Sequence, residues 1–362
     1  MIPYENLKRL NTPFINKFRE KFEQVLENGY YILGPELEAF EKEYAAWHNT
    51  RFCVGVSNGL DALVLSLKAC NLPDGSEVIV PSNTYIASIL AILNCQLVPV
   101  LVEPDITTYN IDPDKLEEAI TPNTKAIMVV HLYGKCCQMD KIIAIKEKHN
   151  LFLIEDCAQS HGATYKNKLS GTFGDFGAFS FYPTKNLGAL GDAGAIICND
   201  EGHKNTLAQL RNYGSERKYY NDIIGYNNRL DEMQAAFLSA KLPYLAQMNA
   251  HRNKLAQLYF NNLTDKFILP VQDADYYDVY HIFNIRHEKR DDLQTYLSKK
   301  EIGTVIHYPV PPHKQKALAG ITGIKKSYPI AEEIHNTTLS IPCSFCHTEE
   351  EIMQVIEALN NY

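Results

Sequence analysis

A lysine that follows an aromatic segment is the most reactive candidate in the sequence. Lys185 comes after the run Phe179-Ser180-Phe181-Tyr182-Pro183-Thr184, and glycines follow it at positions 188, 191 and 194. Glycines let a backbone turn tightly or approach a ligand closely. A lysine held there would be partly desolvated, which lowers its pKa and makes the neutral amine a nucleophile. The segment alone is equally compatible with a surface lysine before a glycine-rich turn.

Two further groups of residues could act together with this lysine. The turn Ser57-Asn58-Gly59 precedes a predicted helix, and the free N–H groups at a helix start suit a phosphate. Asp156, Gln159 and His161 follow a predicted strand. Each feature alone is typical of a helix cap or a strand end. Together, a phosphate-binding turn, an acid for a ring nitrogen and a lysine for a Schiff base are the parts that a pyridoxal-phosphate site needs.

The elements that must position these residues alternate between strand and helix. The predicted strands are Glu77–Val80, Leu97–Val102, Ala126–Val130, Leu151–Ile154, Gly177–Phe181 and Ala195–Cys198. The predicted helices between them are Gly59–Ala69, Asp114–Ala119 and Asp140–Lys148. This alternation predicts an α/β fold with a mostly parallel sheet that helices cover on both faces. Ligands of such sheets bind beyond the carboxyl ends of the strands, where the candidate residues lie.

The pattern changes near residue 245. A long polar helix is predicted at Tyr244–Asn262, and shorter strands and helices follow it at Ile282–Arg286, Asp291–Lys299, Thr304–Ile306 and Thr348–Asn360. We therefore predict a large domain over residues 1–245, including a mostly helical N-terminal segment, and a smaller α+β domain over residues 246–362.

Composition excludes several classes of protein. Of the 362 residues, 45% are hydrophobic and 22% are charged, which is ordinary for a globular chain. The net charge of -8 argues against a general nucleic-acid binder. The uncharged stretch from Val78 to Val102 is divided by Pro81 and Asn94, so no membrane span is predicted. No signal peptide is visible, and the odd number of cysteines, nine, favours a reduced cytoplasm.

One short motif points to a different chemistry. Cys343-Ser344-Phe345-Cys346-His347 matches the haem-attachment pattern C-x-x-C-H. A single five-residue match is weak, and haem attachment usually accompanies export. We expect this segment to be a packed loop, and we predict no metal site.

The motifs in order resemble the nucleotide-sugar aminotransferases, the DegT/StrS group of the aspartate-aminotransferase superfamily. The resemblance runs from residue 34 through the C-terminal domain and rests on Gly34-Pro35-Glu36, Ser57-Asn58-Gly59-Leu60-Asp61-Ala62-Leu63, Pro81-Ser82-Asn83-Thr84-Tyr85, Glu155-Asp156-Cys157-Ala158-Gln159, Ser180-Phe181-Tyr182-Pro183-Thr184-Lys185 and Gly225-Tyr226-Asn227-Asn228-Arg229-Leu230-Asp231-Glu232. It implies the fold of type I pyridoxal-phosphate enzymes.

The resemblance implies roles around the cofactor ring. Lys185 would bind the cofactor and move the proton, Asp156 would pair with the pyridinium nitrogen, and Gln159 would hydrogen-bond the ring hydroxyl. Tyr85 would stack on the ring. His161, beside the acidic motif, is a further catalytic candidate, although a histidine satisfied by the backbone is an equal alternative.

It also implies how the phosphate and the subunits are arranged. Asn58, Gly59 and Ser180 would hold the phosphate, and Asn227 would reach the phosphate in the neighbouring subunit. The active unit would then be a homodimer with shared active sites.

A finer resemblance concerns the sugar. The segment from Tyr182 to Ala189 is similar to the branch that acts at C3 of dTDP-linked 3-keto-6-deoxyhexoses. The candidate substrate-binding residues are Tyr30, Tyr182, Tyr213, Arg217, His307, Tyr308 and His313.

The predicted reaction is a ping-pong transamination. L-glutamate would donate the amino group and leave as 2-oxoglutarate, and the keto sugar would accept it, giving a dTDP-3-amino-3,6-dideoxyhexose for a surface glycan such as O-antigen or for a natural product. The alternatives are a C4 or acetamido-sugar nucleotide aminotransferase and a non-catalytic regulatory protein that binds pyridoxal phosphate. A nucleotide-binding fold without this cofactor would need a G-x-G-x-x-G turn near the first strand, where none occurs.

Overall fold

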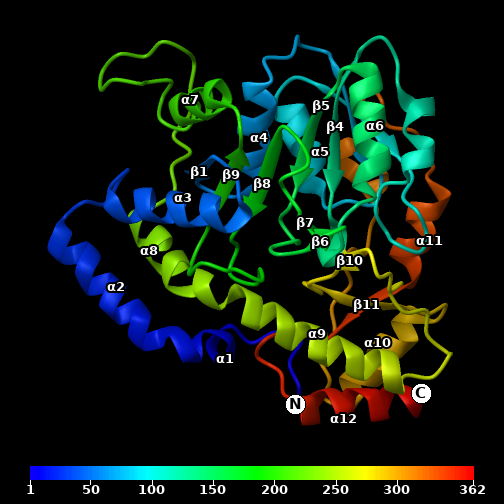
Figure 1. Ribbon diagram of the computed structural model, residues 1–362. Helices are drawn as coiled ribbons and strands as arrows, with labels where there is room; N and C mark the ends of the chain where they lie inside the picture. The colour runs from blue at the N-terminus through cyan, green and yellow to red at the C-terminus, as the bar shows by residue number, and fades with distance from the viewer.

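A seven-stranded sheet organises the larger part of the chain (Figure 1). The computed structural model describes all residues from 1 to 362. The strand order is β1-β9-β8-β5-β4-β2-β3, and β9 alone runs antiparallel to its neighbours. The strands are β1 (Phe52–Val56), β2 (Glu77–Pro81), β3 (Val98–Val102), β4 (Thr124–Val130), β5 (Phe152–Asp156), β8 (Phe176–Ser180) and β9 (Gly194–Cys198). The predicted mostly parallel sheet is confirmed.

Helices cover both faces of the sheet because its strands are apolar on both sides. Along β2, Val78 and Val80 belong to one buried cluster, whereas Ile79 between them belongs to another. The first face is covered by α4 (Gly59–Ala69), α5 (Ile86–Asn94) and α7 (Glu201–Leu210). The other is covered by α3 (Pro35–His48), α6 (Met139–His149) and α8 (Glu232–Lys241). Successive residues of a strand point to opposite faces, so a strand buried on both sides needs no polar alternation.

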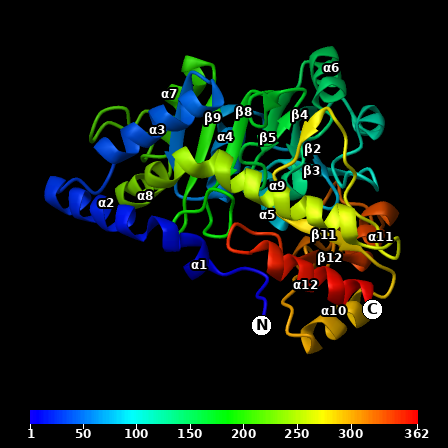
Figure 2. The ribbon, with the colours of Figure 1, turned by 60° about the horizontal axis from the view of Figure 1, so that its bottom comes forward.

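The C-terminal part has a core of its own. Its buried cluster of 18 residues joins a two-stranded sheet to three helices. These elements are β11 (Phe283–Arg286), β12 (Thr338–Ile341), α9 (Leu245–Asn262), α10 (Arg290–Lys299) and α12 (Glu349–Asn360). Figures 1 and 2 show α9 extending from α8 towards α12, with both termini near α12. The expected domain boundary after residue 245 falls at the start of α9 and stays a prediction.

The remaining elements connect these two parts. The N-terminal segment contains α1 (Leu7–Asn11), η1 (Thr12–Phe14) and α2 (Ile15–Asn28), and α11 (Pro329–Thr337) precedes β12. A three-stranded sheet is formed by β10 (Tyr276–Tyr277), β6 (Thr164–Tyr165) and β7 (Lys168–Leu169). Short 3-10 helices lie at η4 (Leu132–Gly134), η5 (Leu242–Tyr244), η6 (Pro312–Lys314) and η7 (Lys316–Leu318).

Two elements differ from the sequence pattern. The expected helix at Asp114–Ala119 consists of two 3-10 helices, η2 (Pro113–Lys115) and η3 (Glu117–Ala119). Each of these helices has three residues, and 3-10 geometry is typical of such short helical segments. The expected strand at Thr304–Ile306 is a single bridge between Val305 and Ser340, because the preceding Gly303 pairs instead with Ile2 at the N-terminus.

The Cys343–His347 loop joins the two ends of the chain by hydrogen bonds. The Ser344 N–H donates to His347 Nδ1 at 2.9 Å, and His347 Nε2 lies 2.8 Å from the carbonyl oxygen of Pro3. Cys346 Sγ lies 3.3 Å from a carboxylate oxygen of Glu5. The groups of the C-x-x-C-H pattern therefore contact protein atoms, as a packed loop requires.

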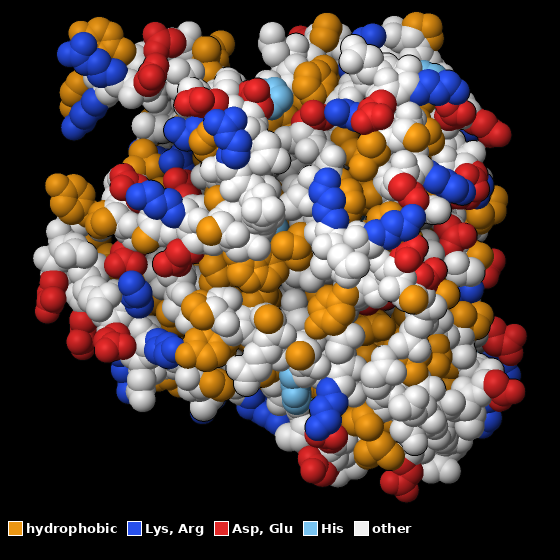
Figure 3. All heavy atoms as spheres, viewed as in Figure 1, with side chains coloured by type: hydrophobic (Ala, Val, Ile, Leu, Met, Phe, Trp, Pro, Cys, Tyr) orange, Lys and Arg blue, Asp and Glu red, His pale blue; other side chains and the backbone are white.

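The surface carries charges of both signs. Figure 3 shows basic and acidic side chains interspersed over the visible face, with apolar side chains gathered near its middle. None of the helices combines the length and the apolar composition needed to cross a bilayer.

Candidate active site

A cavity of about 580 Å³ opens where the predicted site residues come together. It lies beyond the carboxyl ends of β4, β5 and β8, as the α/β architecture predicts. The predicted residues that line it are Asn58, Gly59, Tyr85, Asp156, Gln159, Ser180, Tyr182, Lys185, His307 and Tyr308. Residues as far apart in sequence as 58 and 308 thus share one wall.

The first turn of α4 forms one end of this cavity. Asn58 caps the helix, since its Oδ1 accepts from the Asp61 N–H at 2.9 Å. A Cβ built on Gly59 would lie 2.5 Å from the Cβ of Ser180, so only glycine fits against the end of β8. The N–H groups of the first helical turn have no partner within the helix, and a phosphate fits such a turn.

Asp156, the last residue of β5, is a buried carboxyl without a paired cation. Ser88 Oγ donates to its Oδ2 at 2.8 Å, and the Ala158 N–H donates to its Oδ1 at 3.1 Å. Burial raises the pKa of Asp156, while these two hydrogen bonds and the charge of Lys185 oppose the rise. A positively charged ring nitrogen is the kind of group that would stabilise this carboxylate.

Lys185 borders the same cavity and is partly buried. Desolvation lowers the pKa of its amine to about 8, and the carboxylate of Asp156 opposes part of that shift. Its backbone N–H donates to the Tyr182 carbonyl oxygen at 2.8 Å, which holds the turn after β8. Near neutral pH an appreciable fraction of this amine is uncharged and can act as a nucleophile.

Aromatic and amide groups form the rest of the wall. Gln159 Nε2 donates to the Tyr308 hydroxyl at 3.0 Å, and the Tyr133 N–H in η4 donates to Gln159 Oε1 at 2.6 Å. The rings of Tyr85 and Tyr308 lie 5.2 Å apart at an interplanar angle of 35°. A planar aromatic cofactor fits a wall of this kind, so the donor set, the glycine at α4 and the unpaired carboxyl together suit pyridoxal phosphate.

Two predicted residues lie outside the cavity lining in packed surroundings. The ring of His161 lies 5.4 Å from that of Phe179 and 5.5 Å from that of Phe181, and neither of its ring nitrogens has a hydrogen-bond partner. Burial lowers its pKa well below the usual value. His313 Nε2 lies 3.0 Å from Glu332 Oε1. The catalytic role of His161 and the substrate role of His313 stay predictions.

Four other predicted residues lie on exposed segments away from the cavity lining. These are Tyr30, before α3, and Tyr213, Arg217 and Asn227, in the segment between α7 and α8. That segment projects from the body at the upper left of Figure 1, and its tip leaves Tyr219 86% and Ile224 92% exposed. Within one chain these residues do not complete the cavity.

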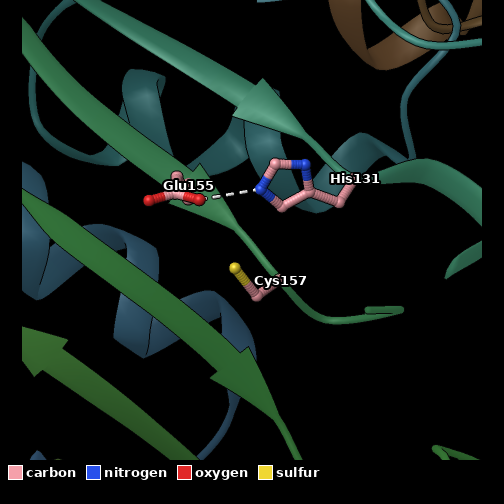
Figure 4. A group of neighbouring side chains, drawn as sticks. All are labelled: His131, Glu155 and Cys157. Carbon is pink, nitrogen blue, oxygen red and sulfur yellow. Dashed lines mark hydrogen bonds and ion pairs between the residues drawn. The ribbon is translucent and has the colours of Figure 1, made fainter. Parts of the chain in front are cut away.

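A second buried cluster lies next to Asp156 and consists of His131, Glu155 and Cys157 (Figure 4). His131 Nε2 lies 2.9 Å from Glu155 Oε2, and the Cys137 N–H donates to His131 Nδ1 at 3.0 Å. Backbone N–H groups of residues 171, 173 and 174 also donate to the carboxylate of Glu155, at 2.6 to 2.8 Å. The carboxylate oxygens of Glu155 thus hold the loop before β8, and both ring nitrogens of His131 already have protein partners.

Sequence reasoning missed Ser88 and His281, which contact the site. The spacing of Thr84, just before α5, and Ser88, in its first turn, was an available signal, since their hydroxyls lie 2.9 Å apart. His281 lies 95 residues beyond its hydrogen-bond partner Asn186, and no local pattern identifies it.

Comparison with known proteins agrees with this geometry. A model of the DegT/DnrJ/EryC1/StrS aminotransferase family matches residues 14–360. The dTDP-3-amino-3,6-dideoxy-alpha-D-galactopyranose transaminase of Aneurinibacillus thermoaerophilus is 51% identical, with 100% of this chain and 99% of the relative covered. The dTDP-3-amino-3,4,6-trideoxy-alpha-D-glucose transaminase of Streptomyces venezuelae is 42% identical, with 100% and 96% covered.

A solved structure of similar sequence shares the whole fold. The structure of S. venezuelae DesV in complex with a ketimine intermediate superposes with a TM-score of 0.97 at 42% identity, covering 99% of this chain and 98% of that chain. The cavity, the family match and the superposition lead to one conclusion. The chain belongs to the DegT/DnrJ/EryC1/StrS aminotransferase family, whose members depend on pyridoxal phosphate.

Proposed function

We propose that this protein transfers the amino group of L-glutamate to C3 of a dTDP-linked 3-keto-6-deoxyhexose, giving a dTDP-3-amino-3,6-dideoxyhexose. The chemistry is carried by one observation, that Lys185, Asp156 and the first turn of α4 line a single cavity. The substrate is supported by the 51% identity to a dTDP-3-amino-3,6-dideoxy-galactopyranose transaminase over the whole chain.

The chain's own residues have separate roles in this proposal. Bound pyridoxal phosphate supplies an electron sink for the reacting carbon. The amine of Lys185 binds the cofactor and then moves the proton, and its lowered pKa keeps both protonation states accessible. Asp156 stabilises positive charge at the ring nitrogen, and Gln159 hydrogen-bonds the ring hydroxyl. Tyr85 packs on the ring.

The phosphate and both reactants use the same cavity in this proposal. Asn58, Gly59 and Ser180 hold the phosphate at the start of α4. L-glutamate gives up its amino group first and leaves as 2-oxoglutarate, and the keto sugar then takes the amino group in the same cavity. Tyr182, His307 and Tyr308, which line that cavity, contact the sugar.

We propose a homodimer in which each cavity is completed by the partner. The exposure of Asn227, Tyr213 and Arg217 supports this, because they lie outside the lining of their own cavity on a segment that projects from the body. Asn227 would then reach the phosphate bound by the partner, and Arg217 the nucleotide.

The proposed location is the cytoplasm, and the product would serve a surface glycan such as O-antigen or a natural product. The location is supported by the cysteines, since all nine are free and buried.

The test follows the cofactor and then the sugar. Purified protein with added pyridoxal phosphate should show the visible absorption band of the lysine-bound cofactor, L-glutamate should remove that band, and Lys185→Ala should lack it. A dTDP-linked 3-keto-6-deoxyhexose of either C4 configuration should restore the band and yield the amino sugar by mass spectrometry. Turnover of 4-keto or acetamido sugars alone would favour those alternatives, and a band that neither glutamate nor any keto sugar changes would favour a regulatory protein.

A further inference from the structure

Two side-chain amides, joined to each other by a hydrogen bond, fix the orientation of His281 beside the cavity. Asn249 Nδ2 donates to the His161 carbonyl oxygen at 2.8 Å, which turns Asn249 Oδ1 towards Asn186. Asn186 Nδ2 donates to that oxygen at 2.8 Å and to the Val279 carbonyl oxygen at 3.0 Å. Carbonyl oxygens only accept hydrogen bonds, so neither amide can be reversed without losing a buried contact.

The amide of Asn186 in turn sets which nitrogen of His281 carries a proton. Asn186 Oδ1 lies 3.1 Å from His281 Nδ1, and because this oxygen is an acceptor, Nδ1 must be the donor. Burial lowers the pKa of His281 well below its usual value, and the positive charge of Lys185 lowers it further. The imidazole is therefore neutral at neutral pH, and Nε2 carries a free lone pair.

Backbone hydrogen bonds hold the segment that carries His281 against the η4 turn. The Val279 N–H donates to the Gly134 carbonyl oxygen at 2.9 Å, and the Ile282 N–H donates to the Tyr133 carbonyl oxygen at 3.2 Å. Gly134 has a φ of +103°, and a Cβ there would lie 2.9 Å from the backbone nitrogen of His281. The same η4 turn donates to Gln159, so His281 and Gln159 are positioned by one element.

His281 differs in this respect from the neighbouring histidines. His307 also lines the cavity, but its Nδ1 partner is the hydroxyl of Ser340 at 2.8 Å, which can donate or accept. His161 lies outside the lining. Of the histidines at this cavity, His281 is the one whose Nε2 is left as an acceptor, because hydrogen bonds to backbone carbonyl oxygens fix the two amides, one of which contacts its Nδ1.

We propose that His281 is a specificity-determining residue whose Nε2 accepts a hydrogen bond from a hydroxyl of the sugar substrate. This inference rests on the proposed function and adds a contact to the same site. The L-glutamate side chain has no hydroxyl, so the contact serves the sugar half of the reaction. A site that hydrogen-bonds a substrate hydroxyl rejects analogues without it, because its buried acceptor is then left unpaired.

The test combines one measurement without substrate and one with both substrates. In the wild-type protein with ¹⁵N-labelled histidine and without cofactor, NMR should show His281 protonated at Nδ1 and not at Nε2, with the signal assigned by its loss in His281→Asn. In the holoenzyme, His281→Asn should raise the KM for the keto sugar about tenfold. The rate at which L-glutamate removes the absorption band should change less than about twofold.

Two variants sharpen the result. His281→Gln, whose amide oxygen can reach the position of Nε2, should recover part of the sugar KM. His251→Asn is the matched control, because His251 Nε2 contacts the His347 carbonyl oxygen at 2.8 Å and lies outside the cavity lining. It should change neither the KM for the keto sugar nor the rate at which L-glutamate removes the absorption band.

Each contrary outcome is distinct. Protonation of His281 at Nε2, an unchanged sugar KM in His281→Asn, or an equal loss with both substrates would overturn the inference while the wild type still transaminates sugars. A wild-type enzyme that accepts L-glutamate but rejects every keto sugar would overturn the proposed function, and with it the sugar as the partner of His281.

Discussion

Two desolvated lysines of this chain have similarly lowered pKa values and different surroundings. Desolvation lowers the pKa of both Lys185 and Lys241 to about 8. Lys185 borders the cavity, and the one charged group acting on it is Asp156. Lys241 lies in the core at the end of α8, where its Nζ donates to the Gly188 carbonyl oxygen at 2.7 Å and to Asn11 Oδ1 at 3.2 Å.

The difference shows that a lowered pKa alone does not identify a reactive group. Burial produces the shift at both positions, but the amine of Lys241 is occupied by fixed acceptors. The amine of Lys185 faces a cavity that a ligand can enter. Lys241 holds the turn that follows Lys185, since Gly188 lies in that turn, so the second lysine supports the segment that carries the first.

The largest expected effect is at the cavity lysine. Lys185→Ala should lower turnover by about 10³-fold, because it removes the group that moves the proton. It should not lower the Tm of the apoprotein by more than about 2 °C, since the side chain makes no hydrogen bond and is only partly buried. Steady-state assays and thermal unfolding measure the two effects. A large fall in Tm would mean that Lys185, like Lys241, is part of the packing.

The core lysine should affect stability in a pH-dependent way. The pKa of Lys241 is about 8 in the folded protein and 10.5 by reference, so the unfolded chain holds more protons between these values. The contribution of Lys241 to the free energy of unfolding should therefore rise between pH 8 and 10.5, by roughly 3 kcal/mol at most, and stay constant below pH 8.

Lys241→Met should lack that rise, and it should retain the removal of the absorption band by L-glutamate. Denaturant unfolding of both proteins at several pH values provides the comparison, with other titrating groups cancelling in the difference. Identical pH profiles for the two proteins would show that Lys241 is solvated in the folded state.

A smaller effect is expected at the hydroxyl that supports Asp156. Ser88→Ala should lower kcat about tenfold, because a hydrogen bond to a charged group contributes about 1.5 kcal/mol. It should also raise the pKa of the Asp156 carboxyl in the apoprotein, since the hydrogen bond from Ser88 lowers it. Carboxyl ¹³C NMR measures this titration.

Two serine variants separate positioning from packing. Ser88→Thr should retain most of the activity because it keeps the hydroxyl. Ser66→Ala removes an equally buried hydroxyl, which donates to the Ala62 carbonyl oxygen at 2.7 Å inside α4, and should leave the Asp156 titration unchanged. Equal changes in kcat and in the Asp156 titration for Ser66→Ala and Ser88→Ala would mean that Ser88 contributes only packing.

The smallest expected effect concerns the aromatic wall. Tyr85→Ala should raise the Kd for pyridoxal phosphate about fivefold, because aromatic packing contributes about 1 kcal/mol. Tyr85→Phe should bind as tightly as wild type. Tyr277, 40% exposed in β10 and outside the cavity lining, provides the control as Tyr277→Ala. Fluorescence titration measures the Kd, and an effect of equal size at both tyrosines would contradict a specific role for Tyr85.

Some sequence motifs turn out to hold the fold together. Gly34-Pro35-Glu36 and the segment ending in Glu232 contributed to the family resemblance, and the structure joins them. Glu232 Oε1 accepts from the Gly34 N–H at 2.7 Å, and its Oε2 accepts from the Glu36 N–H at 2.9 Å. This buried carboxylate caps the start of α3 and fixes it against α8. Motif similarity alone could not separate such a contact from a catalytic one.

The sequence by itself determined most of the sheet and most of the cavity wall. Buried parallel strands need continuous apolar runs, so six of the seven strands of the large sheet were predicted to within two residues. The seventh strand, β1, was not predicted. The carboxyl ends of such strands meet at one edge, so the positions of Asp156 and Lys185 after their strands already predict that the two lie close together. Both are local signals, in which strand, turn and functional side chain lie within a few residues of one another.

Tertiary structure decided what no local pattern contains. His281 becomes an acceptor because carbonyl groups of His161 and Val279 orient two amides between them, and Lys241 becomes structural because Gly188 lies within reach. A hydrogen bond depends on distance and direction between atoms, and sequence separation specifies neither. The residue types that do chemistry were therefore readable in the chain, whereas their protonation, their partners and their access to the cavity were set only when distant segments packed together.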